Sequence, residues 1–373
     1  MNSRFIKPDF CNNIINVSAT IADFLGCPND KPILPELAKE LKKGYKNVVF
    51  MILDGMGVNP IEKNLSKDSF LRRHQRQVLT SVFPSTTTNA TTTFLTNKYP
   101  MEHGWFGWNL YFEDLQKAVD IYLDADSYTG EPVEKGYVTR VLPIEPYYKK
   151  AKTDYKTSVV VPEYWDNDEE NKYVWYTFDE MFGHIEKICK NAGKQFIYTY
   201  CAEPDSTMHR FGVSSAEAYS VINRLNDGIE ALYAKLTDTL FIITADHGQI
   251  DVDGCIEIYK DKELISMLEW PQFLEPRALA FKVKENCHKN FIETFNKKYG
   301  MDFELFKVDD LIKGNYFGGN IVNGHAKLLG DYIAVGTTNK IMKPRESCHP
   351  FKGHHTSLTE EMEVPLVVIG RKE

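Results

Sequence analysis

The chain has 373 residues, too many for one simple core and too few for three full domains. Hydrophobic residues make up 43% and charged residues 26%, as in an ordinary globular protein, and the net charge of −8 gives no indication of electrostatic binding to a nucleic acid polymer. The chain has seven cysteines without a CxxC pair, no apolar signal-peptide core and no apolar run long enough to cross a membrane. We therefore expect a cytoplasmic protein without a membrane span.

The first predicted elements are a helix and a buried strand. Residues 34–44 have proline at the first helical position, lysines late and glycine after the end, which indicates a helix. Residues 48–53 form a continuous apolar run rich in β-branched side chains, which is typical of a buried parallel strand. Asp54 follows this strand directly, at the edge where open α/β sheets place their ligands.

A threonine-rich segment follows at residues 83–104, FPSTTTNATTTFLTNKYPMEHG. Its Pro84-Ser85 entry, with apolar residues a turn or two later, indicates a helix start, although threonine has poor helix propensity. Such a conflict between propensity and pattern is expected at functional positions. A threonine in the first turn points its hydroxyl at the positive end of the helix dipole, where phosphate oxygens bind. A Thr/Ser-rich surface loop is the alternative interpretation.

Residues 105–112, WFGWNLYF, are aromatic, and residues 113–171 show no clear period. We interpret residues 113–171 as an excursion from the core that walls a pocket. Four aromatic residues here are either packing for this lobe or a stacking surface for a nucleobase, namely Trp105, Phe106, Trp108 and Tyr111.

The second half alternates strands and helices. A capping box of Thr177 and Glu180 begins one helix, and a second of Ser214 and Glu217 begins a helix that runs to about residue 236. We interpret residues 255–339 as a small inserted α+β cap, with a helix at 290–298 and short strands near residues 303 and 332. Further buried strands are predicted at residues 196–200, 240–244 and 364–369.

This alternation predicts an α/β fold with a mostly parallel sheet flanked by helices. We expect the core to comprise residues 1–254 and 340–373, including an aromatic-rich lobe at about 113–171, with the cap at 255–339.

Acids and histidines follow three of the predicted strands. Asp205 and His209 are four residues apart and face the same side of a helical turn, and Asp246-His247 ends another strand. A lone Asp-x-x-x-His is more often a surface ion pair, and a lone Asp-His-Gly more often a turn. Their common place at strand ends, with a histidine pair at 354–355 beyond, predicts a metal site. Carboxylate and imidazole ligands without thiolates suit zinc, with manganese or iron as weaker candidates.

Five segments in this order resemble the metal-site motifs of the alkaline phosphatase superfamily, in its nucleotide pyrophosphatase/phosphodiesterase (type I phosphodiesterase) branch. They are VFMILDGMG, the threonine-rich segment, AEPDSTMHRFG, TADHGQ and GHHTSLT. The resemblance covers about residues 45–110, 195–250 and 350–373. It implies an alkaline-phosphatase-like three-layer core with a mostly parallel sheet, and two divalent metal ions, with zinc as the expected metal.

The resemblance makes Thr87 the nucleophile, because its interval to Tyr99-Pro100 matches the family's, whereas Thr86 and Thr88 do not match. The implied ligands of one metal are Asp54, Asp246, His247 and Thr87. Those of the other are Asp205, His209 and one histidine of the last loop, for which we choose His355. His354 and His349 remain candidates.

Two positions depart from the family's pattern. An asparagine that donates to a phosphate oxygen is expected soon after the His-Gly pair, and Asn109 lies one residue later than that position. The glycine that commonly follows the last histidine ligand is replaced by Thr356. The role of Asn109 as a catalytic donor is therefore an expectation.

The implied activity is hydrolysis of a phosphodiester or pyrophosphate through a phosphoryl-threonine intermediate, with a nucleotide or other small molecule as substrate. A phosphomonoesterase, phosphonate hydrolase or phosphomutase on the same metals is the alternative. A non-enzyme in which an ion only stabilises the fold is the third interpretation. The sequence leaves the oligomeric state open.

Overall fold

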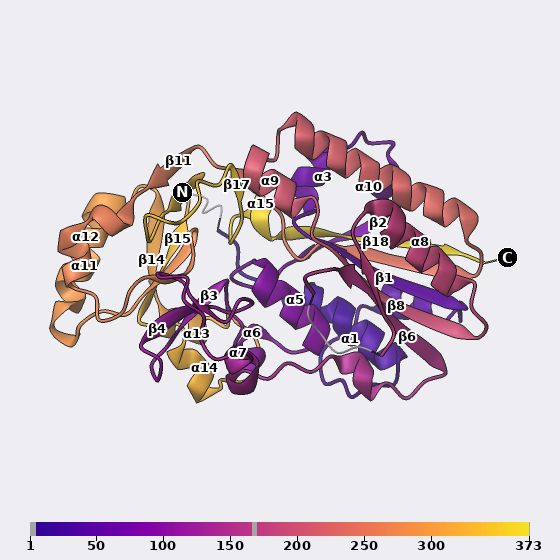
Figure 1. Ribbon diagram of the computed structural model, residues 1–373, viewed down its shortest axis with the longest axis horizontal. Coiled ribbons are helices and arrows are strands. Elements are labelled where there is room, and N and C mark those ends of the chain that lie inside the picture. The colour runs from indigo at the N-terminus through magenta and orange to yellow at the C-terminus, as the bar shows by residue number, and fades with distance from the viewer. Residues whose placement is uncertain (1–4, 166–169, 373) are drawn as a thin grey trace.

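The structure, a computed structural model, describes residues 5–165 and 170–372. Its core sheet has seven strands: β1 (Asn47–Leu53), β2 (Gln75–Thr80), β6 (Tyr155–Pro162), β7 (Lys172–Trp175), β8 (Lys194–Cys201), β9 (Thr239–Thr244) and β18 (Glu363–Arg371). They are arranged in the order β2-β18-β9-β1-β8-β6-β7 (Figure 1). The central β1 is parallel to β8 and β9, which confirms the predicted α/β fold with a mostly parallel sheet.

The core strands are buried as their apolar sequences predict. All seven residues of β1 are buried, since helices cover both faces of the sheet. The closing strand β18 runs antiparallel to both of its neighbours, β9 and β2. Leu53 pairs with Cys201 and Ile52 with Thr244, so β1, β8 and β9 end at the same edge of the sheet.

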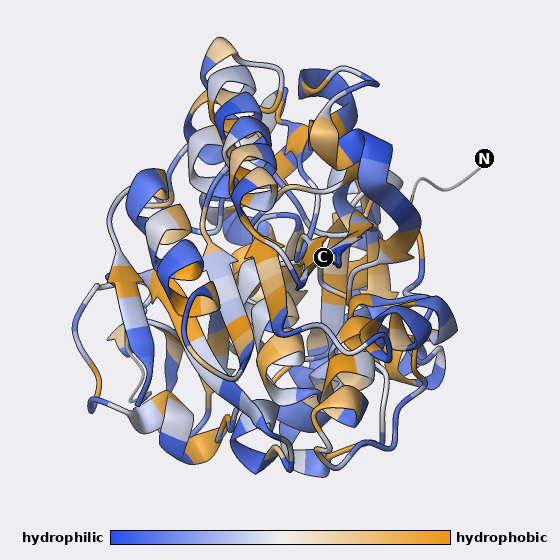
Figure 2. Cartoon of the chain, turned by 90° about the vertical axis from the view of Figure 1, so that its right-hand side faces the viewer, coloured by the Kyte–Doolittle hydropathy of each residue, from blue (hydrophilic) through white to orange (hydrophobic). Residues whose placement is uncertain are grey.

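Helices form the two outer layers. On one face, α1 (Ile14–Phe24) packs against α5 (Thr87–Thr96); on the other, α8 (Phe178–Cys189) packs against α10 (Ala216–Lys235) (Figure 1). Figure 2 shows hydrophobic residues concentrated in the core strands, while the helices carry hydrophilic residues toward the outside. The core therefore has the predicted three layers.

A second sheet of seven antiparallel strands lies beside the core (Figure 1). Its strands are β3 (Asn109–Phe112), β4 (Lys117–Asp120), β5 (Ala125–Asp126), β12 (Phe273–Glu275), β13 (Ala278–Phe281), β14 (Phe303–Lys307) and β15 (Tyr332–Gly336). They are arranged in the order β14-β15-β13-β12-β3-β4-β5, and the residue pair Leu274–Asn109 joins the two halves.

This topology divides the chain differently from the prediction. Residues 113–171 are not one excursion: β4 and β5 join the second sheet, whereas β6 belongs to the core sheet. The predicted cap at 255–339 is only part of a larger sheet, because β3 to β5 complete it. Local periodicity does not reveal such long-range pairing, since sequence spacing carries no information on which strands meet.

The remaining elements are short, apart from one amphipathic helix beside the second sheet. The helices are α2 (Pro35–Leu41), α3 (Val58–Asn64), α4 (Phe70–His74), α6 (Pro100–His103), α7 (Tyr137–Val141), α9 (Asp205–Phe211), α11 (Lys262–Ser266), α12 (His288–Tyr299), α13 (Val308–Lys313), α14 (Asn323–Lys327) and α15 (Thr359–Met362). The short strands are β10 (Ile250–Asp251), β11 (Gly254–Ile256), β16 (Lys340–Met342) and β17 (Gly353–His354).

One predicted cap is displaced by a residue. The Thr177–Glu180 capping box begins α8 as predicted, but Ser215, not Ser214, caps α10 by accepting the Ala218 N–H at 3.0 Å. The Ser214 side chain is instead turned toward Asp251, to which its hydroxyl donates at 2.6 Å. Across residues 5–165 and 170–372, no helix has the length and apolar character needed to cross a membrane.

Candidate metal centre

The carboxyl edge of the core sheet carries the acids that the sequence singles out. Asp54 follows the last residue of β1, Asp205 is the first residue of α9 after β8, and Asp246 lies two residues beyond β9. All three are buried, with exposed fractions of 8% or less. The common register of the three strands thus places three carboxylates in one buried region.

Thr87 is the first residue of α5, and its hydroxyl points into this region. Thr87 Oγ1 lies 3.3 Å from each carboxylate oxygen of Asp54 and 3.2 Å from His247 Nε2. The ring of His247 also lies close to two acids, with Nε2 at 3.2 Å from Asp54 Oδ1 and 3.5 Å from Asp246 Oδ2. These four residues, predicted as the ligands of one metal, form one cluster.

The second predicted ligand set also converges. Single ligand atoms of Asp205, His209 and His355 all lie within 4.8 Å of one another, and His209 Nε2 is 3.3 Å from Asp205 Oδ2. A further group of Asp54, Asp205 and His247 meets the same limit, so Asp205 joins the two clusters. A pair of neighbouring ions would thus share this acidic region.

The three histidines of the last loop differ in their surroundings. His355 joins the cluster and stacks on His247 with ring centroids 3.7 Å apart. His354 Nδ1 is 3.0 Å from the His355 carbonyl and 2.8 Å from its amide, so backbone contacts occupy that nitrogen. His349 is exposed. Thr356, in place of the expected glycine, accepts hydrogen bonds from the Ser85 N–H and hydroxyl, each at 2.7 Å.

Backbone carbonyls orient the three histidines that are predicted as metal ligands, His209, His247 and His355. Nδ1 of His209 lies 2.7 Å from the Gly353 carbonyl, Nδ1 of His247 lies 3.0 Å from Gly248 O, and Nδ1 of His355 lies 2.8 Å from Ser85 O. A carbonyl only accepts hydrogen bonds, so each Nδ1 carries the proton. Each Nε2 is then left with a lone pair, as a metal ligand requires.

The electrostatics of the cluster fit divalent cations. Burial raises the pKa of Asp205 to about 7 and that of Asp246 to about 8, while burial and the nearby Asp205 charge raise the pKa of Asp54. Burial lowers the pKa of His209 to about 4 and also lowers that of His355, so both rings are neutral at pH 7. Asp246 Oδ2 accepts no hydrogen bond within the described chain. Buried carboxylates and neutral imidazoles with a spare oxygen are a donor set for zinc-like ions.

Two residues that hydrogen-bond to the candidate ligands were not predicted from the sequence. The Tyr200 hydroxyl donates to Asp54 Oδ2, and the Gln249 amide donates to Asp205 Oδ1. Tyr200 is the last residue of a predicted strand, and Gln249 stands within the TADHGQ motif. Their positions in the sequence, close to the candidate ligands, could have identified them, because residues that orient metal ligands cluster at the same strand ends.

Asn109 is held within the second sheet. Its Oδ1 accepts the Leu274 N–H at 2.9 Å, and its amide interacts with Asp120. Its predicted donation to a phosphate oxygen stays a prediction. A further acid that the sequence did not single out, Glu275 on β12, contacts Thr86, the residue before Thr87.

The aromatic residues after Gly104 divide into two groups. Trp105, Phe106 and Tyr111 are buried in the hydrophobic core of the second sheet, which supports the packing interpretation for them. Trp108 is 39% exposed and packs edge-on against Tyr122, which is 43% exposed, at a ring separation of 5.9 Å. The Tyr122 hydroxyl lies 2.9 Å from Thr91 Oγ1, one turn along α5 from Thr87.

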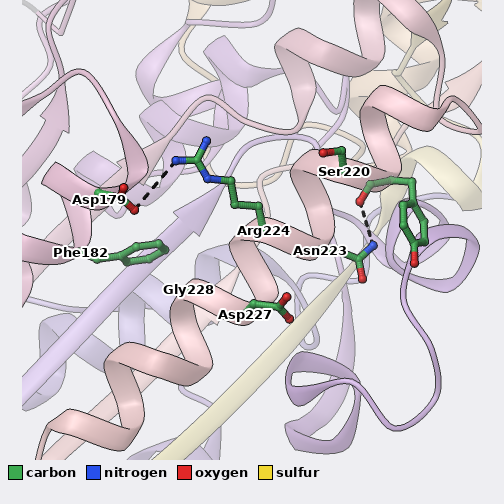
Figure 3. A pocket seen from close by; sticks show the side chains of 8 residues that line it. Asp179, Phe182, Ser220, Asn223, Arg224, Asp227 and Gly228 are labelled. Carbon is green, nitrogen blue, oxygen red and sulfur yellow. Dashed lines mark hydrogen bonds and ion pairs between the residues drawn. The ribbon is translucent and has the colours of Figure 1, made fainter.

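A cleft of about 680 Å³ lies elsewhere, between α8 and α10 (Figure 3). Arg224 and Asp179 form an ion pair across it at 3.9 Å, a surface contact of small energetic value. Its lining residues include none of the acids and histidines of the cluster: Asp179, Phe182, Tyr219, Ser220, Asn223, Arg224, Asp227 and Gly228.

The fold and the cluster at its sheet edge define a class of protein: α/β enzymes that use divalent metal ions to hydrolyse phosphoryl compounds. Within that class, the family model described as type I phosphodiesterase / nucleotide pyrophosphatase matches residues 48–310, and the chain belongs to this family. The resemblance drawn from the five motifs is thereby confirmed. Members of the family use two divalent metal ions, and the described chain has candidate ligands for them.

Solved structures share the fold at low identity. Murine ectonucleotide pyrophosphatase / phosphodiesterase 5 superposes with a TM-score of 0.64 and 18% identity over 87% of this chain and 89% of that chain. The human protein of the same name gives 0.65 and 17%, with coverage of 87% and 89%. Phosphonoacetate hydrolase from Sinorhizobium meliloti 1021, in complex with phosphonoformate, gives 0.62 and 15%, covering 86% and 89%. No curated protein matches the sequence.

Proposed function

We propose that the protein hydrolyses a phosphodiester or pyrophosphate bond of a small molecule, with Thr87 as the nucleophile and two zinc ions as cofactors. The observation that carries the proposal is the place of the Thr87 hydroxyl. It lies at the start of α5 and within 3.3 Å of both Asp54 oxygens and His247 Nε2. The murine relative supports this role, because a threonine-to-alanine variant of that protein, solved in complex with AMP, is described as inactive.

The protein side chains would divide the site between two ions. Asp54, Asp246 and His247 with Thr87 would hold one, and Asp205, His209 and His355 the other. Bound zinc would supply Lewis-acid stabilisation of negative charge on the attacking and leaving oxygens. Protein carbonyls keep the three imidazoles in the tautomer that ligation needs.

Thr87 then acts in two steps. Its Oγ1 loses its proton toward Asp54 and attacks phosphorus, so that the Oγ1–P bond forms as the bond to the leaving oxygen breaks. Water next attacks phosphorus and the Oγ1–P bond breaks. Asp54 returns its proton to Thr87 Oγ1, and the proton released by the water goes to the expelled leaving oxygen. The N–H groups of the first turn of α5, which lack partners within the helix, would stabilise charge on the phosphoryl oxygens.

A diester is favoured by the surface next to the nucleophile. The second substituent of a diester needs a surface to lie on, and the exposed rings of Trp108 and Tyr122 offer one, with Tyr122 held to α5 through Thr91. Phosphonate hydrolysis is the second candidate, because the phosphonoacetate hydrolase fold covers 86% of this chain.

The test compares three substrates with zinc-loaded protein: bis(p-nitrophenyl) phosphate, p-nitrophenyl phosphate and phosphonoacetate. We expect the diester to be cleaved fastest, with activity lost in Thr87→Ala and partly kept in Thr87→Ser. Faster cleavage of the monoester would contradict the diesterase assignment, and faster cleavage of phosphonoacetate would favour the second candidate. Full activity of Thr87→Ala would contradict the role of Thr87.

A further inference from the structure

Glu275 is a buried acid that belongs to the second sheet but contacts the core helix of the nucleophile. It is the last residue of β12, is 4% exposed, and accepts the Thr86 hydroxyl at 2.7 Å through Oε1. The same oxygen accepts the Trp108 N–H at 2.7 Å. Gly107 permits this approach, since a Cβ there would lie 2.8 Å from Leu274 Cδ1 and 3.4 Å from Glu275 Cγ.

Thr86 occupies the N-cap position of α5, directly before Thr87. Its backbone is extended, with φ −141° and ψ 149°, which is the usual N-cap geometry. A threonine in this position normally turns its hydroxyl oxygen onto the N–H of the second or third helical residue. Thr86 makes no such bond: its side chain is turned toward Glu275, to which the hydroxyl donates.

The missing Thr86 cap affects the N–H groups of Thr88 and Asn89, which such a cap would satisfy. The first N–H groups of a helix have no partner within the helix, so a side-chain cap or a ligand must satisfy them. Without the Thr86 cap they remain available on the turn that begins with Thr87. The first intrahelical bond runs from Ala90 N–H to the Thr86 carbonyl at 2.9 Å, so the helix itself begins normally.

We propose that Glu275 is a positioning residue: it draws the Thr86 hydroxyl away from the helix start and so keeps the first-turn N–H groups of α5 open for phosphoryl oxygens. The link to phosphate rests on the proposed function, whereas the effect on the helix start does not. Burial raises the pKa of Glu275 to about 7, and the acceptor role persists in both protonation states, because a carboxylic acid keeps a carbonyl oxygen.

The experiment measures amide hydrogen exchange of Thr88 and Asn89 by NMR in the metal-free protein, and kcat/KM for bis(p-nitrophenyl) phosphate in the zinc-loaded protein. In Glu275→Leu, the released Thr86 hydroxyl should cap the helix, slow exchange at both amides severalfold, and lower kcat/KM about tenfold. Glu275→Gln keeps an acceptor oxygen and should retain fast exchange and most of the activity.

The decisive variant adds Thr86→Val to Glu275→Leu. Valine cannot cap, so exchange should become fast again and kcat/KM should recover. A purely structural role of Glu275 predicts the opposite, a further loss in the double variant. Unchanged exchange and kcat/KM in Glu275→Leu, or a further loss in the double variant, would overturn the proposal.

Two controls separate this proposal from the proposed function. Thermal unfolding of each variant shows whether it folds, and Glu275→Ala, with less bulk facing Gly107, replaces the leucine variant if that one does not. If the wild-type protein cleaves none of the three reporter substrates, the proposed function fails, and the exchange measurements still decide the role of Glu275 at the helix start.

Discussion

The core sheet and the second sheet contribute to the candidate metal centre in different ways. The core sheet supplies the acids, because β1, β8 and β9 end together and each is followed by an aspartate. The second sheet supplies contacts to the segments that carry Thr87 and His355, through Glu275 and Arg277 around the β12–β13 turn. Strand register sets the positions of the candidate acidic ligands, whereas the neighbouring sheet contacts the helix start and the loop beside them.

The contact of the second sheet with the last loop is a buried ion pair. Arg277 and Glu361 are both fully buried, and Arg277 also donates to the carbonyls of Thr338 and Lys340 at 2.7 and 2.6 Å. Glu361 Oε2 accepts the N–H groups of Ser357 and Leu358 at 2.9 and 2.6 Å. These bonds fix the loop directly after His355.

The largest effect is expected from removing the proposed nucleophile, which lies on the core side of this comparison. Thr87→Ala should lower kcat roughly a thousandfold or more, because among the described residues Thr87 is the one whose hydroxyl contacts both Asp54 and His247. Zinc content and thermal stability should stay near the wild-type values. Steady-state kinetics with zinc analysis of the same samples provides the check, and loss of zinc would show that Thr87 is chiefly a ligand.

The choice among the loop histidines is tested by metal affinity. His355→Ala should weaken zinc binding by more than the roughly 10–100-fold that loss of an outer partner costs, since His355 lies with Asp205 and His209. His349→Ala is the matched control, because His349 is exposed. Competition titrations with a chelator measure both, and a larger effect of His349→Ala would reverse the assignment.

The second sheet is tested by breaking its buried ion pair. Arg277→Met should lower the free energy of unfolding by about 3–5 kcal/mol, because it leaves the Glu361 charge buried without its partner. Lys43→Met removes an exposed pair with Glu40 and should cost less than about 1 kcal/mol. Urea unfolding compares them, and equal costs would mean that the buried pair contributes no special stability.

A smaller effect is expected at the outer contacts of the ligands. Tyr200→Phe removes the hydroxyl that donates to Asp54 and should weaken zinc affinity about tenfold. Tyr198→Phe, two residues earlier on β8, is a matched control, since the buried Tyr198 hydroxyl has no hydrogen-bond partner within the described residues. Equal affinities of the two variants would show that Tyr200 does not tune the site.

The smallest effect is a pH dependence of the metal-free protein. Burial raises the pKa of Asp205 to about 7 and that of Asp246 to about 8, above the ordinary 3.8, so the folded state binds more protons than the unfolded state. The stability from the protonated carboxyls is therefore lost as the pH rises through these values. The lowered pKa of His209 acts in the opposite direction, but only below its ordinary 6.5.

Between pH 7 and about 8.5, the Tm of the metal-free protein should fall by a few degrees, and the Tm gain on adding zinc should increase. Differential scanning calorimetry measures both quantities. Asp246→Asn should flatten the metal-free profile, and a Tm that rises across this range would contradict the assignment.

Prediction from sequence succeeded where local pattern and function coincide. The apolar runs of β1, β8, β9 and β18 are visible because each is buried on both faces, and the acids after three of them mark the site. The second sheet was not predicted as a unit, because β3 and β12 pair across 165 residues. Glu275 was missed for the same reason: only the folded sheet brings it to Thr86.

The position of β18 within the core sheet has a consequence for biosynthesis. This strand, Glu363–Arg371, lies between β9 and β2, and His355 and Glu361 directly precede it. A nascent chain can therefore form β1, β8 and β9 on the ribosome but must leave a gap beside β9 until residues beyond 360 emerge. Such late, non-local closure is slow. The candidate ligand His355 lies just before β18, so the candidate ligand set would come together only at this late stage of folding.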